Sequence, residues 1–202
     1  MNLLSRIARK VKSALHDLRH GGYTGGVHPT RYAHLGATHT VSTKHALIPL
    51  LLGPFLRPGD VFVDVGCGRG RVLNWVADDG RAAAIFGLEL DKRFAAEVAL
   101  RFKANDKVTI VAGDALSSLP DSATLFYLWN PFNEKVMERF KERLIEKYRR
   151  LGSLVSLRVI YHHCLFASVW RNDPRCRVSR ISLPESELDE AILVTFDEAA
   201  AS

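Results

Sequence analysis

The chain has 202 residues, of which 47% are hydrophobic and 25% charged, and its formal net charge is +6. This length and composition are typical of one globular domain, or of one domain with an appendage. The most apolar stretch, residues 46–56, is interrupted by Pro49, Gly53 and Pro54, so no transmembrane helix is expected. The apolar residues near the start of the chain are spaced rather than contiguous, so no secretory signal is expected either.

The cysteines and the charge distribution indicate the compartment and the partners of the protein. Cys67, Cys164 and Cys176 are odd in number and far apart. We expect free thiols in a reducing compartment, hence a cytoplasmic protein, rather than a disulfide framework or a zinc site. Residues 1–20 contain five basic residues and one acidic residue, and residues 134–150 contain seven basic and four acidic residues. This excess allows an anionic partner but does not require one.

The first predicted element is an amphipathic helix. Residues 3–18 carry aliphatic side chains at helical spacing, with basic residues between them. Its role is open between docking onto its own domain, covering a substrate site, and contacting a membrane surface or nucleic acid. The glycines of residues 21–26 predict a flexible hinge. Residues 27–45 are polar, and residues 45–56 predict a short helix.

From residue 60 onward, apolar runs typical of strands alternate with helical patterns. This alternation predicts a parallel sheet with helices on both faces. The connection at residues 184–190 is too short for a helical crossover, so the last two strands should pair antiparallel. The predicted strands are residues 61–65, 83–88, 108–111, 125–129, 153–160, 178–183 and 191–196, and the predicted helices are residues 71–79, 91–103 and 134–151, with a helical turn at 114–119.

The strongest chemical signal is a glycine-rich loop after the first of these strands. Asp64 stands near the end of that strand, and Gly66, Gly68 and Gly70 follow at every second position. Glycines let a backbone turn sharply and approach a ligand closely, and ligands of open α/β sheets bind beyond the carboxyl ends of the strands. A dinucleotide fingerprint would place the third glycine one position later. The carboxylate of Asp64 would repel a pyrophosphate, but it suits a ligand with an ammonium group.

This loop resembles motif I of the class I S-adenosylmethionine-dependent methyltransferases. Residues 86–91 match the family's next motif, in which the acidic residue, here Glu89, binds the ribose hydroxyls. Residues 111–116 match the third, in which the acidic residue, here Asp114, lies near the adenine. The fourth strand ends in the position of the family's catalytic motif, and the resemblance covers residues 42–197.

The resemblance implies a fold and a cofactor. The fold is a Rossmann-like α/β methyltransferase fold, a seven-stranded, mostly parallel, doubly wound sheet with an antiparallel last strand and an N-terminal helical appendage. Residues 1–56 are the predicted helical or lid segment, and residues 57–202 the cofactor-binding domain. The cofactor is S-adenosyl-L-methionine, with S-adenosyl-L-homocysteine as product, and the implied binding residues are Asp64, Gly66, Cys67, Gly68, Gly70, Glu89, Leu90, Asp114, Ala115, Asn130, Thr40 and Thr43.

Some of these residues have a plainer alternative role. Asp114 could serve only as a helix N-cap, because aspartate favours that position. Glu89 could pair with a nearby base. Thr40 and Thr43 could bind the carboxylate of the cofactor or simply form a turn. Cys67 is expected to be a small packing residue and not a nucleophile.

The candidate catalytic residues follow the fourth and fifth predicted strands. Asn130, Pro131 and Phe132 resemble the Asp/Asn-Pro-Pro-aromatic motif of amino-group methyltransferases, although the second proline is absent. Asn130 could therefore orient an amine or form part of a turn. His162 and His163 are candidates for a general base, or else exposed or capping residues.

Trp129 is a candidate wall of the acceptor pocket, or else a core residue. The histidines show no metal-ligand spacing, so the expected site is metal-free. Methyl transfer from a sulfonium is an in-line displacement, in which an enzyme mainly aligns the acceptor.

The expected function is methyl transfer to an unidentified acceptor. A nitrogen of a small molecule or peptide is preferred, because the chain has little room for a separate recognition domain. A protein-lysine or RNA/DNA methyltransferase is the second hypothesis, supported by the two basic segments. A cofactor-binding scaffold or sensor without enzymatic activity is the third.

Overall fold

The computed structural model describes residues 11, 13–15, 17–151, 156–184 and 190–196. Residues 11, 13–15 and 17–19 are helical, and the rest of the helix predicted over residues 3–18 lies outside the described residues. The elements that follow are β1 (Val27–His28), η1 (Ala33–Leu35), β2 (Thr40–Val41), α2 (Ile48–Leu52), β3 (Val61–Val65), α3 (Arg71–Asp79), β4 (Ala84–Glu89), α4 (Lys92–Arg101), β5 (Val108–Ala112), η2 (Ala115–Ser117), β6 (Leu125–Trp129), α5 (Glu134–Leu151), β7 (Arg158–His162), α6 (Ser168–Arg171), β8 (Cys176–Ile181) and β9 (Ala191–Phe196).

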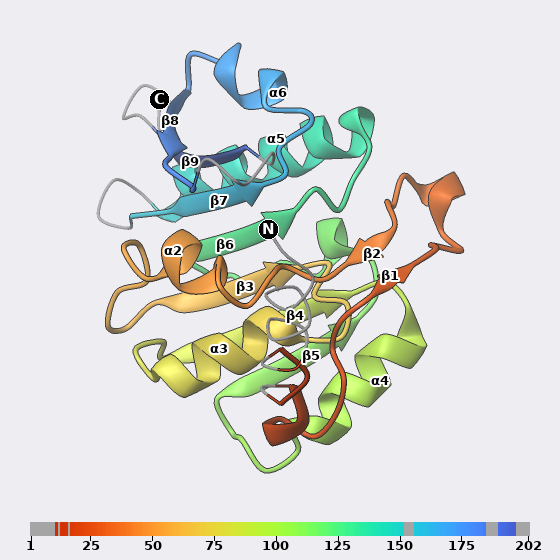
Figure 1. The fold of residues 1–202 in the computed structure, drawn as a ribbon. Helices are drawn as coiled ribbons and strands as arrows, with labels where there is room; N and C mark the ends of the chain where they lie inside the picture. The colour runs from red at the N-terminus through yellow and green to blue at the C-terminus, as the bar shows by residue number, and fades with distance from the viewer. Residues whose placement is uncertain (1–10, 12, 16, 152–155, 185–189, 197–202) are drawn as a thin grey trace.

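Seven strands form one twisted sheet in the order β5-β4-β3-β6-β7-β9-β8 (Figure 1). The strands from β5 to β7 are mutually parallel, and β9 pairs antiparallel with both β7 and β8. The α/β sheet with an antiparallel last strand is therefore confirmed. The chain leaves β3 on one side toward β4 and returns on the other as β6, which makes the carboxyl end of β3 the place where an open sheet binds ligands.

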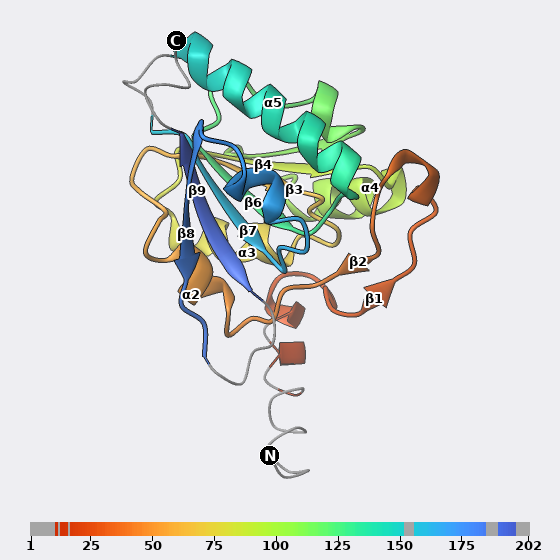
Figure 2. The ribbon, with the colours of Figure 1, turned by 90° about the horizontal axis from the view of Figure 1, so that it is seen from above.

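Helices cover both faces of the sheet, with α5 on one side and α2 and α3 on the other (Figure 2). The faces follow from the alternation of side chains along each strand. In β3, Phe62 packs with α2 and α3, whereas Val63 and Val65 pack in the cluster that contains α5. Asp64 lies two residues after Phe62 and so is on the face of α3. The leucines of α2 belong to the same core as Phe62, and the division of the chain after residue 56 stays a prediction.

The segment predicted as a flexible hinge is packed against the domain. Thr24 has no exposed surface. Its hydroxyl donates a hydrogen bond to Asp17 Oδ1 at 2.6 Å and accepts one from Arg71 Nε at 2.9 Å. Glycines in the sequence indicated freedom here, but these long-range bonds hold the segment in place.

Two other parts of the chain differ from the prediction. The strand predicted over residues 153–160 is observed as β7, Arg158–His162, and residues 152–155 lie outside the described part. The pair β1–β2 and the helix α6 were not predicted, because each is too short to produce a periodic pattern. Within the described residues, no helix is both long and apolar enough to cross a membrane.

Candidate active site

The glycine loop is fastened to the end of β4. The backbone N–H groups of Gly66 and Cys67 both donate to the carbonyl of Leu88, at 2.8 and 3.0 Å. Gly68 has a φ of +54°, a conformation that favours glycine. A Cβ atom at Gly68 would also lie 2.6 Å from Thr40 Cγ2. The loop therefore needs glycine both for its turn and for the close approach of the segment that covers it.

Two buried carboxylates flank this loop. Asp64 is 4% exposed and Glu89 is 7% exposed, and they lie near the carboxyl ends of the adjacent parallel strands β3 and β4. Glu89 Oε2 accepts a hydrogen bond from Gly68 N at 2.7 Å, and Oε1 accepts one from Asp91 N at 2.8 Å. Glu89 thus positions the loop with one oxygen and the start of α4 with the other.

Burial makes the negative charges of this pair costly. The pKa of Asp64 is raised to about 8, first by burial and then by the charge of Glu89. Burial also raises the pKa of Glu89, although the N–H groups of Asp91 and Gly68 oppose the shift. A cation placed between the two side chains would offset both effects. The site is therefore suited to a positively charged ligand.

Two adjoining cavities open at the carboxyl ends of the strands. The larger is lined by Glu89, Leu90, Asp114 and Ala115, together with a roof formed by residues 29–39. The smaller is lined by Asp64, Cys67, Gly68, Thr43 and Tyr127, among others. Gly66, Thr40, Val41 and Trp129 line both cavities. One elongated ligand could therefore reach from the Asp114 side to the Asp64 side past the glycine loop.

The roof is attached to the chain that follows β6. Thr38 N donates to the carbonyl of Pro131 at 3.1 Å, and the Thr38 hydroxyl donates to the carbonyl of Asn130 at 2.5 Å. Ala37 forms an antiparallel bridge with Phe132. These bonds close the larger cavity on the side away from the sheet.

One family model of known proteins matches the part of the chain that forms this site. Residues 62–151, which contain the glycine loop, Glu89, Asp114 and the end of β6, match the family model described as a methyltransferase domain. This segment is therefore similar to a methyltransferase domain. Among curated proteins, none matches the sequence of the chain.

Solved structures of methyltransferases share the fold. A methyltransferase from Pyrococcus furiosus is 16% identical, with a TM-score of 0.64 over 95% of this chain and 98% of that one. An RNA methyltransferase from Salinibacter ruber, in complex with S-adenosyl-L-homocysteine, is 21% identical, with a TM-score of 0.61 over 78% and 95%. An O-methyltransferase from Bacillus cereus is 13% identical, with a TM-score of 0.59 over 77% and 82%. The acceptors differ among these proteins, so the fold does not identify the acceptor here.

The methyltransferase domain implies S-adenosyl-L-methionine as cofactor, and the residues present fit it. Among the described residues, no basic side chain is paired with the buried carboxylates of Asp64 and Glu89, and a sulfonium and an ammonium group would supply the compensating charge. Gly66 and Gly68 line these cavities, so the loop offers backbone without side chains to a ligand. Ten of the twelve residues predicted to bind the cofactor line the two cavities, namely Asp64, Gly66, Cys67, Gly68, Glu89, Leu90, Asp114, Ala115, Thr40 and Thr43.

Two predicted cofactor residues do not line either cavity. Gly70 is the N-cap of α3 with a φ of +73°, and a Cβ atom there would lie 2.9 Å from Val98 Cγ1, so glycine is needed where the start of α3 packs against α4. Asn130 is 4% exposed, whereas its neighbour Pro131 lines the larger cavity. Asp114 combines both of its possible roles, because Oδ1 accepts the N–H of Leu116 at 3.0 Å as an N-cap and the residue also lines the larger cavity.

The predicted catalytic residues separate into two groups. Trp129 lines both cavities, and His163 stacks on its ring with centroids 4.6 Å apart and planes at 7°. His162 does not follow the fifth strand as predicted but is its last residue, 1% exposed. Its Nδ1 is 3.0 Å from the Tyr127 hydroxyl. Neither histidine lines either of these two cavities, and a role as general base stays a prediction.

The environment of Asn130 is that of a turn, the second of the two roles considered for it. Its side-chain Oδ1 accepts a hydrogen bond from the Tyr161 hydroxyl at 2.5 Å, and its carbonyl accepts the bond from Thr38. Its φ of +39° turns the chain sharply after β6. Asn130 therefore fixes the turn that holds the roof, and both of its oxygens are engaged in doing so.

Sequence reasoning missed most of the roof. The larger cavity is also lined by four residues of the roof and one of α5, namely Tyr32, Leu35, Thr38, His39 and Arg139. Thr38 also bonds the roof to the chain after β6. The roof is flanked by two strands of only two residues each, β1 and β2, which give no detectable periodicity. Cys67, in contrast, behaves as expected, because burial and then the charge of Asp64 raise the pKa of its thiol and leave it unreactive.

Proposed function

We propose that this chain is an S-adenosylmethionine-dependent methyltransferase that acts on a small molecule or a peptide. The observation that carries the proposal is the pair of buried carboxylates, Asp64 and Glu89, on either side of a glycine loop at the carboxyl ends of β3 and β4. The cofactor supplies a methyl group already activated by a positive sulfur. The protein's part is then to hold the two substrates in line and to exclude water.

Each lining residue has a role in this proposal. Glu89 binds the ribose hydroxyls, and Asp114 and Ala115 lie along the adenine. Asp64 and Thr43 hold the methionine end in the smaller cavity. Trp129, which lines both cavities, stands beside the reacting methyl group and forms one wall of the acceptor pocket.

The roof supports the choice of a small acceptor. Residues 29–39 cover the larger cavity and are bonded to the chain after β6. A large folded acceptor would have to insert a flexible end or a single group beneath them, whereas a small molecule or a peptide can enter whole. A nitrogen as the methylated atom is inferred from the motif of Asn130, Pro131 and Phe132. Since both oxygens of Asn130 are engaged, other groups of the roof would have to orient that nitrogen.

A cytoplasmic setting is part of the same proposal. Cys67 and Cys164 are buried free thiols and Cys176 is a partly buried one. Such thiols persist in reducing compartments.

Two experiments test the proposal in sequence. Isothermal titration with S-adenosylmethionine and S-adenosylhomocysteine should detect binding at one site, and absence of both would remove the central claim. Transfer of a labelled methyl group is then followed into fractions of small molecules, peptides, protein and RNA from a cell lysate. Label in the first two fractions supports the proposal, label only in protein or RNA overturns the acceptor class, and binding without transfer to any fraction indicates a scaffold.

A further inference from the structure

The N-terminal helical residues dock through their polar side. Asp17 has no exposed surface and bonds with Thr24, His45 and Arg71. The aliphatic side chains face the opposite way: Val11 is 52% exposed, Leu15 56% and Leu18 65%. These three are four and three residues apart, so they form one stripe along the helix. An amphipathic helix in a globular protein normally buries this stripe, and here it is exposed.

The charge around the stripe is of one sign. Residues 1–20 contain five basic residues, and their only acidic residue is Asp17. Asp17 is buried and neutralised by Arg71, with Arg71 Nη2 2.9 Å from Oδ2. The sequence of this segment therefore combines an exposed apolar stripe with an excess of basic residues. This combination is the one that binds at the interface of an anionic lipid bilayer.

A groove beside the stripe is basic and incompletely bonded. It lies between residues 19–23 and the helices α3 and α4, and it contains Arg19, Arg69, Arg101 and Asn74. Asn74 is 1% exposed, and neither atom of its amide has a hydrogen-bond partner among the described residues. The Nε atoms of Arg69 and Arg101 are also buried without a partner there. Three of these four atoms, Asn74 Nδ2 and the two Nε atoms, are donors. Buried polar groups are nearly always bonded, so the three donors point to a ligand that accepts several hydrogen bonds.

The groove already accommodates one carboxylate. Arg69 Nη2 is 3.1 Å from Glu97 Oε2, and Arg101 Nη1 donates to the carbonyl of Arg69 at 2.7 Å. Three guanidinium groups still outnumber this single acidic side chain. Phosphate oxygens match the remaining donors, because guanidinium and amide N–H groups bind them at several points.

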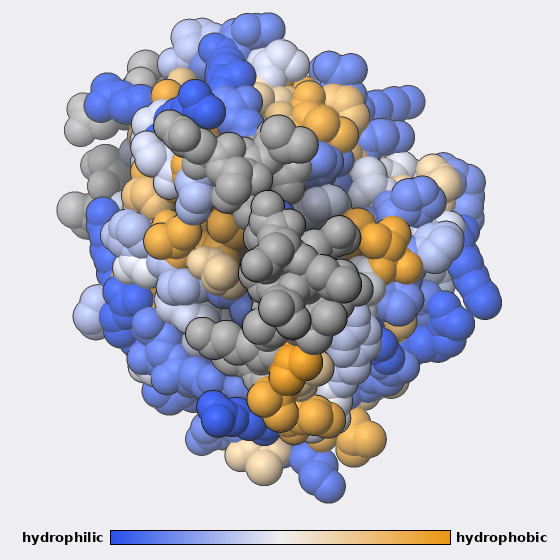
Figure 3. Space-filling view, viewed as in Figure 1, coloured by the Kyte–Doolittle hydropathy of each residue, from blue (hydrophilic) through white to orange (hydrophobic). Residues whose placement is uncertain are grey.

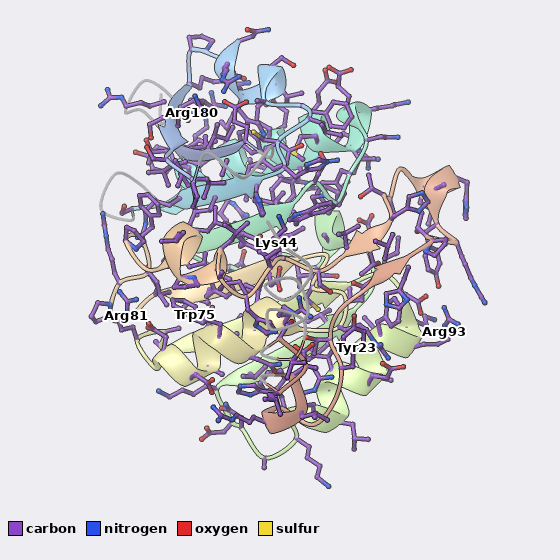
Figure 4. All side chains as sticks on the ribbon, viewed as in Figure 1. Tyr23, Lys44, Trp75, Arg81, Arg93 and Arg180 are labelled. Atoms are coloured by element: carbon purple, nitrogen blue, oxygen red, sulfur yellow. The ribbon has the colours of Figure 1, made fainter. Side chains whose placement is uncertain are left out.

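The rim of the groove is apolar, like the stripe. Leu100 is 67% exposed and Tyr23 is 57% exposed, and both line the groove. Figure 4 labels Tyr23 where the N-terminal part of the chain passes in front of α4. Figure 3 shows hydrophobic surface gathered below the centre of the view, in this part of the molecule. Phosphate-binding donors thus adjoin exposed aliphatic and aromatic side chains.

We propose that the stripe of Val11, Leu15 and Leu18 and the adjoining groove of Arg19, Arg69, Asn74 and Arg101 together bind an anionic phospholipid membrane. The aliphatic stripe enters the boundary between head groups and acyl chains, and the groove takes a lipid phosphate. Tyr23 and Leu100 lie at the level of the head groups. The protein binds to the surface of the membrane, through a site that is distinct from the two cavities of the methyltransferase domain.

The test is co-sedimentation of the full chain with vesicles of phosphatidylcholine alone and of phosphatidylcholine with phosphatidylglycerol. The chain should sediment with the second and not the first. Leu15→Asp with Leu18→Asp should weaken this binding at least about tenfold, and Arg19→Gln about fivefold. Leu165→Asp is the matched control, because Leu165 is 64% exposed in another part of the molecule, and it should bind like the wild type.

Asn74 is tested separately, since it is buried. Asn74→Leu should raise the thermal stability of the free protein, because it removes an unbonded buried amide, and should weaken binding to anionic vesicles. Unchanged vesicle binding in this variant overturns the assignment of the groove. Titration of S-adenosylmethionine should give wild-type affinity for every variant, which separates this surface from the proposed methyltransferase function.

Other occupants give different results. Binding of an RNA oligonucleotide that depends on Arg19 but not on Leu15 and Leu18, with no vesicle binding, overturns the lipid assignment. Stabilisation by inorganic phosphate without vesicle binding does the same. Self-association that is lost in the double leucine variant, again without vesicle binding, assigns the stripe to a second copy of the chain and also overturns the proposal.

Discussion

Asp17 and Arg71 form an ion pair of 2.9 Å across 54 residues of sequence, and both side chains are buried. Arg71 is the first residue of α3, directly after the glycine loop. Its Nη1 also donates to the carbonyl of Thr43, at 3.1 Å, and Thr43 lines the smaller cavity. The N-terminal helical residues are thus connected through one guanidinium group to the loop and to the cover of the proposed cofactor site.

Replacing Asp17 with Asn should destabilise the protein by about 3–5 kcal/mol, because it leaves the Arg71 charge buried and unpaired. Burial raises the pKa of Asp17, but the hydrogen bond from Thr24 and the charge of Arg71 outweigh it, and the pKa is lower than usual. A lowered pKa stabilises the folded state above the unfolded pKa, about 4, and this contribution is lost as the pH falls through the folded value. Denaturant unfolding at pH 7 and at acid pH measures the difference.

The control is Asp78→Asn, which removes a carboxylate that is 58% exposed and pairs with His20 at 3.1 Å. An exposed pair contributes at most about 1 kcal/mol. If the two variants lose equal stability, the buried connection between Asp17 and Arg71 does not hold the segment in place.

Asp64 should make both stability and cofactor affinity depend on pH. Its pKa is about 8 in the folded protein and about 4 in an unfolded chain. The folded state therefore holds a proton that the unfolded state has released, and stability should fall as the pH rises from about 4 to about 8. Affinity for S-adenosylmethionine should rise over the upper part of this range, because a cationic ligand binds the ionised carboxylate.

Titration calorimetry in two buffers of different ionisation enthalpy should detect release of a proton from Asp64 on binding. The ammonium group of the ligand titrates near pH 8 as well, so Asp64→Asn is needed to isolate the protein's contribution. Asp121→Asn, at a side chain that is 91% exposed, should leave the profile unchanged. A wild-type profile identical to that of Asp64→Asn would remove Asp64 from the site.

Glu89→Ala should weaken cofactor binding at least about tenfold, because a charge-assisted hydrogen bond contributes about 1.5–3 kcal/mol. Glu89→Gln should retain more affinity than Glu89→Ala, since an amide oxygen can still accept the N–H of Gly68 or Asp91. Glu146→Ala, at a side chain that is 61% exposed, serves as the control. Equal affinity of Glu89→Ala and the wild type would displace Glu89 from ribose binding.

Local patterns were sufficient to predict the parts of the fold whose contacts are repeated along the chain. The strands β3 and β6 and the helix α5 have the predicted bounds. Each is defined by its own alternation or helical stripe. The candidate cofactor residues Asp64, Glu89 and Asp114 could be proposed because each lies near the carboxyl end of a strand of the same parallel sheet.

Contacts between distant segments could not be predicted in this way. Thr38 bonds with Asn130 across 92 residues, and Tyr161 bonds with Asn130 across 31. Neither contact leaves a periodic signal, so the roof was missed and the role of Asn130 stayed open between orienting an amine and forming a turn. The docking of the N-terminal residues through Asp17 is a similar case, because helical periodicity identifies an apolar face but not the partner that covers it.

The close approach of Thr40 to the glycine loop gives a last prediction. Gly68→Ala would place a Cβ atom 2.6 Å from Thr40 Cγ2 and would force alanine to a φ of +54°. The positive φ costs about 1–2 kcal/mol, and the collision adds about 1–3 kcal/mol. Thr40→Ser removes only Cγ2. The double variant Gly68→Ala with Thr40→Ser should therefore recover the free energy lost to the collision but not that lost to the positive φ. Unfolding of the four proteins gives a coupling energy between the two positions of about 1 kcal/mol or more.

Gly59→Ala measures the backbone contribution alone, because Gly59 has a φ of +86° and nothing lies within 4 Å of an added Cβ atom. The double variant should therefore lose about as much stability as Gly59→Ala does. Cofactor affinity should follow the same order, since Thr40 lines both cavities and is displaced only when alanine at position 68 meets its methyl group. If Thr40→Ser recovers neither stability nor affinity in the Gly68→Ala background, the cover does not rest on the loop as described.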